Sequence, residues 1–555
     1  MHTRDILFRE ETRDRLMMGI EKLNDVVRIT LGPDGENVIL DRLYSVPIST
    51  KDGVTVAREV FLEDRVENAA AQLLKQVASK SARMAGDGTT TATILGHGLF
   101  KEGLKALRGS VNSVKLRKGI KLAVAAVVSN LKKNSTPIKD YDDLFNIARI
   151  SSNDDKEIGK LVADAFTHAG RDGEVNFIKG NRDKTELNIT DGICFDSGFI
   201  DPIFINNFQN QTVEYKGKIR IVFHENPFDT EEKFGKLVRK IVAKDSPADD
   251  MPPTLIIADN LGQAVLPYAA RNNQSGKFPM CFVKAPSFHQ KRRELLDDMA
   301  LITGGKLIPT IEGNEFNKIF ELDQMGYATH VIISKDRTLI MGGAGDPKAI
   351  QERKEQLTAY LNELTDKELP NEEEIAHIRQ RLANFNGLAL IAVGGNTEAE
   401  MHERYFRVED AVHATKAALE EGILPGGGTA LIRSMDCLND LLKDVTLDDD
   451  VRFGVKVVKT ILSSPCRQIA INAGVSADAV VAAIEGEKLY QYGYDAATET
   501  FGNMIDKGII DPTKVVRCAL ENANSIADVL LTTGATISMR DQEGAARAFP
   551  AMGYA

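Results

Sequence analysis

The sequence predicts a multidomain α+β protein in which two helical ends fold together around an inserted α/β module. Apolar residues recur every three or four positions at 12–29 and 67–83, as they do in helices with one buried face. Between about 190 and 387, short β-rich runs such as 219–223 alternate with helical patterns, and from about 400 helices return. Because 555 residues are too many for one core, we expect the ends to form one domain and the middle to be inserted into it.

The other elements follow from the same patterns. After Thr89 a helix is expected through about residue 107, and 116–131 repeat its pattern until Pro137 and the polar residues before it break it. A charged stretch at 353–381 predicts a helical hairpin. Three further apolar runs have the length expected of buried strands, namely 254–257, 331–333 and 388–394.

The composition argues against several classes of partner. Acidic residues outnumber basic residues by 80 to 69, and the formal net charge of −11 provides no basic surface for nucleic acid. No apolar run reaches the roughly 18 residues that a membrane-spanning helix needs. The five cysteines are scattered without CxxC spacing, and the first residues lack the apolar core of a signal peptide. We therefore expect a cytoplasmic protein with neither a nucleic-acid nor a membrane partner.

The segment Ala-Gly-Asp-Gly-Thr-Thr-Thr at 85–91 concentrates phosphate and metal chemistry at the start of a predicted helix. Glycines let backbone N–H groups approach an anion, threonine hydroxyls cap a helix, and the first amides of a helix favour negative charge. Asp87 supplies the hard oxygen ligand that Mg²⁺ prefers. The segment therefore predicts a site for a phosphate-bearing ligand with magnesium.

Three other segments are rich in glycine, threonine and aspartate, at 30–35, 50–53 and 425–428. Each of them alone is most simply a turn, because turns account for most glycine use. None matches GxxxxGK[ST], and no GxGxxG follows a strand and opens a helix. The common nucleotide-binding folds are therefore disfavoured.

Taken together, these segments resemble the signature regions of group I chaperonins, the GroEL-type ring chaperones. The resemblance is carried by residues 30–40, 50–59, 85–93, 407–428 and 493–515, in the family's order and spacing. Residues 191–206 and 284–308 also align with the family's polypeptide-binding domain. The resemblance implies an equatorial domain at 1–133 and 422–555, an intermediate hinge domain at 134–190 and 388–421, and an apical domain at 191–387.

The resemblance also implies a site for ATP or ADP with Mg²⁺, and K⁺ is a further candidate cofactor. Asp87 would bind the Mg²⁺. The family usually has asparagine where this chain has Asp495, beside the base. The residues expected to contact the nucleotide are Thr30, Leu31, Gly32, Pro33, Lys51, Gly53, Gly88, Thr89, Thr90, Thr91, Gly427, Asp495, Ala496, Ala497 and Asp511.

Hydrolysis needs a carboxylate that orients or deprotonates the attacking water, and Asp52 and Asp410 match the family's two such carboxylates. Asp410 precedes the proposed hinge at Gly422, so closing of that hinge would complete the site. From the residue alone, Asp410 is more simply a carboxylate on a helix surface. His413, one helical turn away, is interpreted as a packed histidine rather than a catalytic one.

In the apical domain, the resemblance implies an exposed apolar surface that binds non-native polypeptides. The residues that match this surface are Phe199, Ile203, Phe204, Phe234, Leu237, Val238, Ile241 and Leu266. Periodicity alone favours an ordinary buried core for the stretch 234–241. Pro267 is expected to interrupt the next helix, and Ala270 and Arg271 replace large aliphatic residues, so we expect reduced dependence on a lid co-chaperonin.

Three functions remain open from the sequence. The first is an ATP-driven folding chamber, built as a homo-oligomer with heptameric rings, single or double. The second is a small-molecule kinase or phosphatase, which would need a small polar acceptor pocket that 191–387 does not indicate. The third is a ring scaffold without turnover, against which Asp52, Asp87 and Asp410 argue because a scaffold has no use for them.

Overall fold

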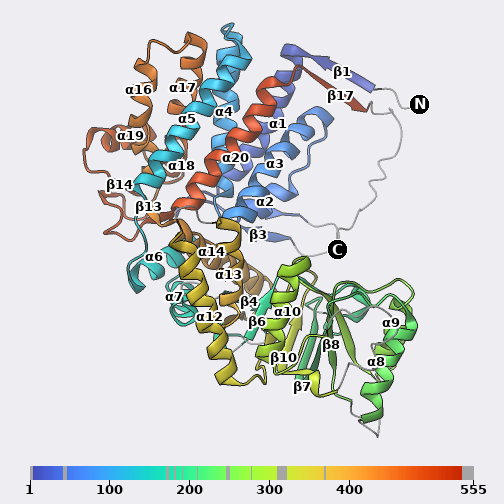
Figure 1. The fold of residues 1–555 in the computed structure, drawn as a ribbon. Coiled ribbons are helices and arrows are strands. Elements are labelled where there is room, and N and C mark those ends of the chain that lie inside the picture. Colours follow the sequence, from blue (N-terminus) through green and yellow to red (C-terminus); the bar gives the residue numbers. More distant parts are fainter. Residues whose placement is uncertain are drawn as a thin grey trace. The chain divides into compact units, whose positions relative to one another are not determined.

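The computed structural model describes residues 4–41, 47–170, 174–180, 183–190, 192–208, 210–244, 251–276, 278–308, 322–367 and 371–539 (Figure 1). It divides into two compact units, Met1–Val162 with His402–Ala555, and Ala163–Met401. The two ends of the chain therefore fold together, as the sequence predicts. We call these the first and the second unit and describe each by itself.

The first unit is built around a bundle of long helices from both ends of the chain. In Figure 1 the red α20 lies with the blue and cyan helices of the N-terminal part, which it contacts. Leu23, Leu74, Leu95 and Leu520 are fully buried in this core. The bundle helices are α1 (Arg9–Arg28), α3 (Arg65–Ala85), α4 (Thr89–Arg108), α5 (Ser113–Asn134), α17 (Asp449–Ile461) and α20 (Thr513–Thr532).

Shorter elements connect and flank the bundle. The helices are α2 (Gly53–Glu59), α6 (Tyr141–Ser151), α15 (Thr429–Arg433), α16 (Asn439–Lys443), α18 (Ser464–Asn472), α19 (Ala477–Gly486) and the 3₁₀ turn η4 (Asp436–Leu438). Four antiparallel pairs of strands are β1 (Arg4–Phe8) with β17 (Ala535–Met539), β2 (Val38–Leu40) with β3 (Ile48–Thr50), β13 (Ile423–Pro425) with β16 (Ile510–Pro512), and β14 (Tyr492–Asp495) with β15 (Thr500–Asn503). Helices α7 (Lys156–Ala169) and α14 (Glu398–Glu421) cross the boundaries between the units.

The second unit contains a six-stranded sheet in the order β6-β11-β10-β7-β8-β9. Its strands are β6 (Gly192–Phe195), β11 (Thr338–Met341), β10 (Gly326–Ile333), β7 (Val213–Phe223), β8 (Thr254–Ala258) and β9 (Met280–Lys284). The pairs from β7 to β9 are parallel and the others are antiparallel. The other elements are α8 (Glu231–Lys244), α9 (Leu266–Gln274), α10 (His289–Thr303), α12 (Pro347–Thr365), α13 (Glu372–Ala383), η1 (Pro202–Phe204) and η3 (Leu322–Gln324).

A second sheet in this unit is assembled from segments far apart in the sequence. Its order is β4-β12-β5, with β4 (Glu174–Lys179), β12 (Leu388–Val393) and β5 (Glu186–Thr190). Leu388 and Leu390 of β12 share a buried cluster with Ile332 and Leu339 of the larger sheet. This packing joins the predicted hinge segments to the predicted apical segment within one unit. The structure therefore separates two units, and the division into three domains stays a prediction.

The predicted strands and the predicted helical hairpin of the second unit are confirmed. The runs 219–223, 254–257 and 331–333 lie in β7, β8 and β10, and the stretch 353–381 forms the α12–α13 hairpin. The apolar run after residue 387 is the buried strand β12. These elements have strong local patterns, which is why sequence alone locates them.

One stability prediction arises from a buried ion pair in the second unit. Asp298 of α10 is fully buried and accepts hydrogen bonds from Arg381 of α13, with Nε–Oδ2 and Nη2–Oδ1 distances of 2.6 and 3.2 Å. Replacing Arg381 leaves a buried carboxylate without its main partner. We expect Arg381→Ala to lower the free energy of unfolding by about 3–5 kcal/mol in urea denaturation followed by circular dichroism.

The matched control is Lys291→Ala, which removes an ion pair between the same two helices. Lys291 contacts Glu373 at 2.5 Å, but the Glu373 side chain is 83% exposed. We expect a change of at most about 1 kcal/mol for this variant. Equal losses for the two variants would contradict the importance assigned to burial.

Candidate functional site

The α4 helix begins at a turn that leaves its first amides without a side-chain cap. Gly88, at φ +82°, is the N-cap residue before Thr89, and because it has no side chain it supplies no side-chain cap to the first turn. A 20-residue helix concentrates positive partial charge there, which suits an anion. The Thr89 hydroxyl is buried and has no hydrogen-bond partner among the described residues. A helix start without a side-chain cap leaves N–H groups available to an anion, and phosphate binding at this turn stays a prediction.

Glycines allow neighbouring segments to approach this turn closely. A Cβ atom on Gly88 would lie 2.7 Å from Val515 Cγ1 of α20, and one on Gly53 would lie 2.2 Å from Thr90 Oγ1. The start of α2 is thus packed against the start of α4. A larger residue at either position would push these segments apart.

Four carboxylates from distant parts of the first unit influence one another around this turn. Burial raises the pKa of Asp410 well above its ordinary value, and the charges of Asp87 and Asp52 raise it further. Burial raises the pKa of Asp511 to about 7, and the charge of Asp87 adds to the effect. Burial also raises the pKa of Asp87, against the hydrogen bond from Gly88 N–H. The segments that carry these residues also pack closely, since Gly53 lies against Thr90 and Gly86 lies against His413 of α14, so the predicted metal ligand and both predicted catalytic residues lie around one turn.

This concentration of acidic groups fits a bound cation. Within the described residues, no group of three or more His, Cys, Asp or Glu side chains is arranged to hold a metal ion. A cation would therefore take one or two carboxylate oxygens from the protein and the rest from water or ligand phosphates. Mg²⁺ binds in this way, and Asp87 as its ligand stays a prediction.

Asp52 has a fixed orientation because it caps α2. Its Oδ1 atom accepts from Val54 N–H at 3.0 Å, and its Oδ2 atom accepts from Thr55 N–H at 2.9 Å and from the Thr55 hydroxyl at 2.5 Å. Each carboxylate oxygen can accept a further hydrogen bond. Asp52 is therefore both a structural cap and an acceptor held beside Asp410 and Asp87.

The predicted loop 30–33 is held by a residue that sequence reasoning missed. Asn472 at the end of α18 donates through Nδ2 to the carbonyls of Arg28 and Leu31, at 3.0 and 2.8 Å. Gly32, at φ +88°, packs against Ile469. No motif marks Asn472, because its partners are more than 400 residues away in the sequence.

The structure also brings together Gly427 and Asp511, which the resemblance to chaperonins places at the ribose of the nucleotide. Asp511 in β16 pairs with Leu424 in β13, directly before the glycine loop. A Cβ atom on Gly426 would lie 3.1 Å from Asp511 Oδ1, and the adjacent Gly427 has a φ of +66°. Their roles toward a nucleotide stay predictions.

Asp495 uses its carboxylate within its own hairpin. Its Oδ1 atom accepts from Ala497 N–H at 3.1 Å, and its Oδ2 atom accepts from the Thr498 hydroxyl at 2.5 Å. Burial raises its pKa, but the hydrogen bonds from Thr498 and Lys507 outweigh this and lower the pKa overall. The residue and Ala496 are buried, whereas Ala497 is exposed. The structure thus gives the aspartate at this position a structural role, and the predicted base pocket stays a prediction.

Comparison with known proteins decides the family. A model of the TCP-1/cpn60 chaperonin family matches residues 23–541. The chain belongs to this chaperonin family. Two crystal structures of the chaperonin gp146 from bacteriophage EL, both obtained in the presence of ATP-BeFx, have a similar fold, with TM-scores of 0.74 and 0.68. Each is 20% identical to this chaperonin, and the matches cover 97% of this chain and 99% of gp146.

Most of the predicted polypeptide-binding residues are not exposed in this structure, which corrects the prediction. Five of them have exposed fractions of 0–7% in the core of the second unit, namely Phe204, Phe234, Leu237, Val238 and Ile241. The four of these residues that lie in α8, which we call the α8 stripe, face the core of the unit. The centroid of the Phe234 ring lies 5.4 Å from that of the Phe282 ring. The alternative interpretation of this stripe as core is confirmed. Ile203 is 38% exposed, while Phe199 and Leu266 are half-buried.

Two further points on this unit differ from expectation. Pro267 does not interrupt α9, because the helix begins at Leu266 and proline is tolerated in the first turn. The most exposed aromatic residues of the unit among those described are Phe208 and Phe288, at 75% and 67%, which sequence reasoning missed. Their only sequence signal is an aromatic residue among polar loop residues.

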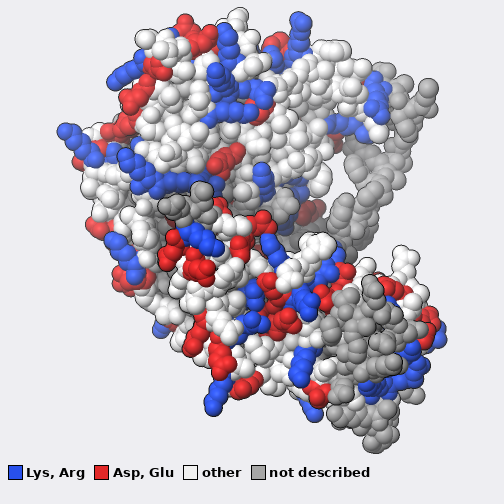
Figure 2. All heavy atoms as spheres, viewed as in Figure 1, with Lys and Arg blue, Asp and Glu red and all other residues white. Residues whose placement is uncertain are grey.

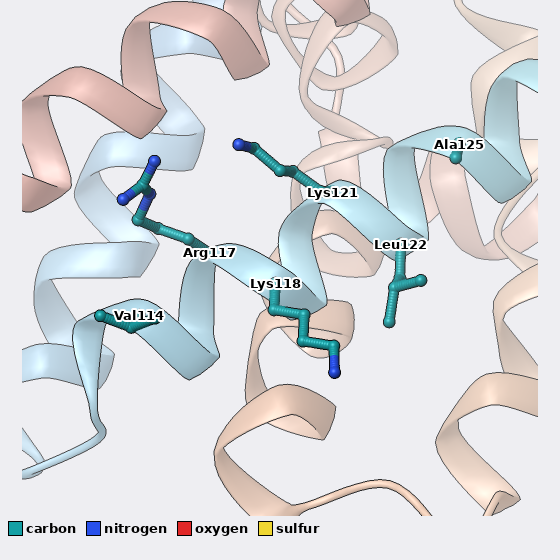
Figure 3. A pocket seen from close by; sticks show the side chains of 6 residues that line it. All are labelled: Val114, Arg117, Lys118, Lys121, Leu122 and Ala125. Carbon is teal, nitrogen blue, oxygen red and sulfur yellow. The ribbon is translucent and has the colours of Figure 1, made fainter.

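A pocket lies on α5, outside these sites. It has a volume of about 410 Å³ on the exposed face of α5 (Figure 3) and is lined by Val114, Arg117, Lys118, Lys121, Leu122 and Ala125. Figure 3 shows Arg117 and Lys121 pointing to one side of α5, where both contact Asp528 of α20. None of the predicted site residues lines it.

The charged side chains are mixed over the surface in view. Figure 2 shows Lys and Arg residues interspersed with Asp and Glu residues on that face. Among the described residues, no helix combines the length and the apolar composition needed to cross a lipid bilayer.

Proposed function

We propose that this chaperonin binds ATP with Mg²⁺ at the start of α4, hydrolyses it, and uses the cycle to capture and release non-native polypeptides. The observation that carries the proposal is the convergence of Asp52, Asp87 and Asp410 on an uncapped helix N-terminus. Family membership and the ATP-BeFx used with gp146 support it.

The chain's own residues account for the chemistry. The free amides of α4 and the unpartnered Thr89 hydroxyl would bind the phosphates, and Asp87 would hold the cation. Bound Mg²⁺ would neutralise charge on the phosphate oxygens. Asp52 and Asp410 would orient the attacking water, and the raised pKa of Asp410 makes its ionised form a stronger base.

We also propose that the protein works as a ring of identical subunits, expected to be heptameric. The β1–β17 ribbon supports self-association, since one of its faces exposes Ile6, Phe8, Ile537 and Met539 by 50–63%. A two-stranded ribbon is marginally stable by itself, so an apolar one is favoured when another subunit covers it. Native mass spectrometry measures the number of subunits directly.

Refolding of an aggregation-prone client tests the whole proposal. We expect recovery of client activity to require ATP and Mg²⁺ and to fall to the level of spontaneous refolding with ADP alone. Running the assay with and without a lid co-chaperonin tests the expected reduced dependence on a lid, and replacing K⁺ by Na⁺ tests the second cation. ATPase activity that changes the yield of no client would contradict a chaperone function and favour the enzyme interpretation.

A further inference from the structure

We propose that Gly86 is a positioning residue whose missing side chain lets α14 seat against the phosphate turn, and so sets how closely Asp410 approaches Asp87. The inference rests on the proposed ATP hydrolysis. It concerns the same site but a residue that touches neither the nucleotide nor the reacting water.

The backbone of α14 passes directly over Gly86. Gly86 ends α3 with a φ of +76°, and its N–H donates to Ala82 O at 2.7 Å. A Cβ atom at this position would lie 1.9 Å from His413 Cβ, 2.7 Å from His413 Cγ and 3.1 Å from His413 Cα. Real Cβ atoms essentially never come within 3.0 Å of another heavy atom. The contact is with the Cα, Cβ and Cγ atoms of His413 and not with the end of a flexible side chain, so a rotation of the imidazole ring cannot relieve it.

The residues on either side of Gly86 face the same side of α14. Ala85 shares a small buried cluster with Ala417 of α14, while the charge of Asp87 acts on Asp410. Residues three and four apart lie on one helix face, so Asp410, His413 and Ala417 form a single row. Successive residues of the turn thus face successive turns of α14, and Gly86 is the central residue of this contact, which we call the seat of α14.

A methyl group at residue 86 must therefore move the helix. Raising the 1.9 Å separation to the 3.0 Å limit requires a shift of about 1 Å. Such a shift would carry Asp410 away from the turn, and a displacement of about 1 Å in a catalytic group can cost about 100-fold in rate. The start of α4 needs no change, because the obstacle lies on the α14 side.

The experiment compares Gly86→Ala in the parent chain and in the Asp410→Ala chain, with single-turnover hydrolysis and nucleotide affinity measured for each. We expect Gly86→Ala to lower kcat about 10- to 100-fold in the parent while the nucleotide Kd stays within about threefold. We expect no further loss in the Asp410→Ala chain, because residue 86 acts through Asp410. His413→Gly, which removes the opposing Cβ, should restore part of the turnover of Gly86→Ala.

Two further measurements distinguish the steric effect of residue 86 on α14 from simple backbone strain at a positive φ. Gly170→Ala is the matched control, because Gly170 has the same φ of +76° but nothing within 4 Å of its Cβ position. Its turnover should equal that of the parent. A crystal structure of nucleotide-free Gly86→Ala should show a larger separation of the Asp410 and Asp87 carboxylates, with residues 86–91 unchanged.

Three results would overturn the proposal. These are parent-like turnover in Gly86→Ala, an equal loss of turnover in the Asp410→Ala chain, and a loss of nucleotide affinity as large as the loss of kcat. Parent-like turnover in Asp410→Ala itself would instead show that the catalytic assignment fails. The separation of the Asp410 and Asp87 carboxylates in the nucleotide-free crystal structure would then show by itself whether Gly86 positions α14.

Discussion

Asp410→Ala is expected to bind ATP normally and to hydrolyse it about 100- to 10,000-fold more slowly, the usual range for loss of a general base. The physical reason is that Asp410 faces Asp87 and Asp52 from α14, where burial and their charges raise its pKa. Removing one of several mutually repelling carboxylates does not weaken binding of an anionic nucleotide. The measurement is steady-state ATP hydrolysis together with the Kd of a fluorescent nucleotide.

Glu420→Gln is the control for this variant, because it changes another carboxylate of α14. Glu420 pairs with Lys514, and its charge is not among the causes that shift the pKa values of Asp87, Asp410 and Asp511. Its turnover is expected to stay within roughly threefold of the parent, since an exposed ion pair contributes little. Turnover of Asp410→Ala within about threefold of the parent would contradict the role assigned to Asp410.

Asp52 offers a second large effect, because its catalytic and structural roles can be separated by substitution. Asparagine is about as good an N-cap as aspartate, so Asp52→Asn should keep the hydrogen bond from Val54 N–H through its one amide oxygen, while its NH2 group cannot accept from Thr55 as Oδ2 does. It cannot act as an anionic acceptor for the attacking water. We expect a loss of kcat of about 100-fold or more, with a smaller fall in the free energy of unfolding than in a variant that has no cap.

Asp52→Ala supplies the comparison, since alanine removes both roles. It should show the same loss of turnover and, in addition, a destabilisation of about 0.5–2 kcal/mol from the lost cap. Thermal unfolding and ATP hydrolysis measured on both variants make the distinction. Normal turnover in Asp52→Asn would leave Asp52 as a cap alone.

Local patterns explain which parts of the molecule could be predicted from the sequence. The turn before α4 is encoded within a few residues, since Gly88 supplies the positive φ and Thr89 begins the helix. The strands of the second unit have the apolar runs that identify buried strands. The convergence of Asp52, Asp87 and Asp410 could be expected only through the resemblance to chaperonins, because more than 300 residues separate the last two.

The α8 stripe shows what a periodic pattern cannot predict, namely which part of the protein an apolar helix face contacts. Phe234, Leu237 and Ile241 recur at helical spacing, which fixes that they share one face but not what that face contacts. In this structure the face is covered by the sheet, and Phe234 packs on Phe282. The most exposed aromatic residues described in this unit, Phe208 and Phe288, lie outside its helices and strands, where no periodicity marks them.

By itself the sequence determined the fold class and the family, and it located the long helices and several apolar strands, because each depends on local pattern or on motifs in the family's order and spacing. Only the tertiary structure decided that Asn472 holds the 30–33 loop, that Asp495 closes its own hairpin, and that α14 rests on Gly86. These contacts join residues that are distant in sequence or depend on side-chain packing, and no local pattern encodes the distance between two packed elements.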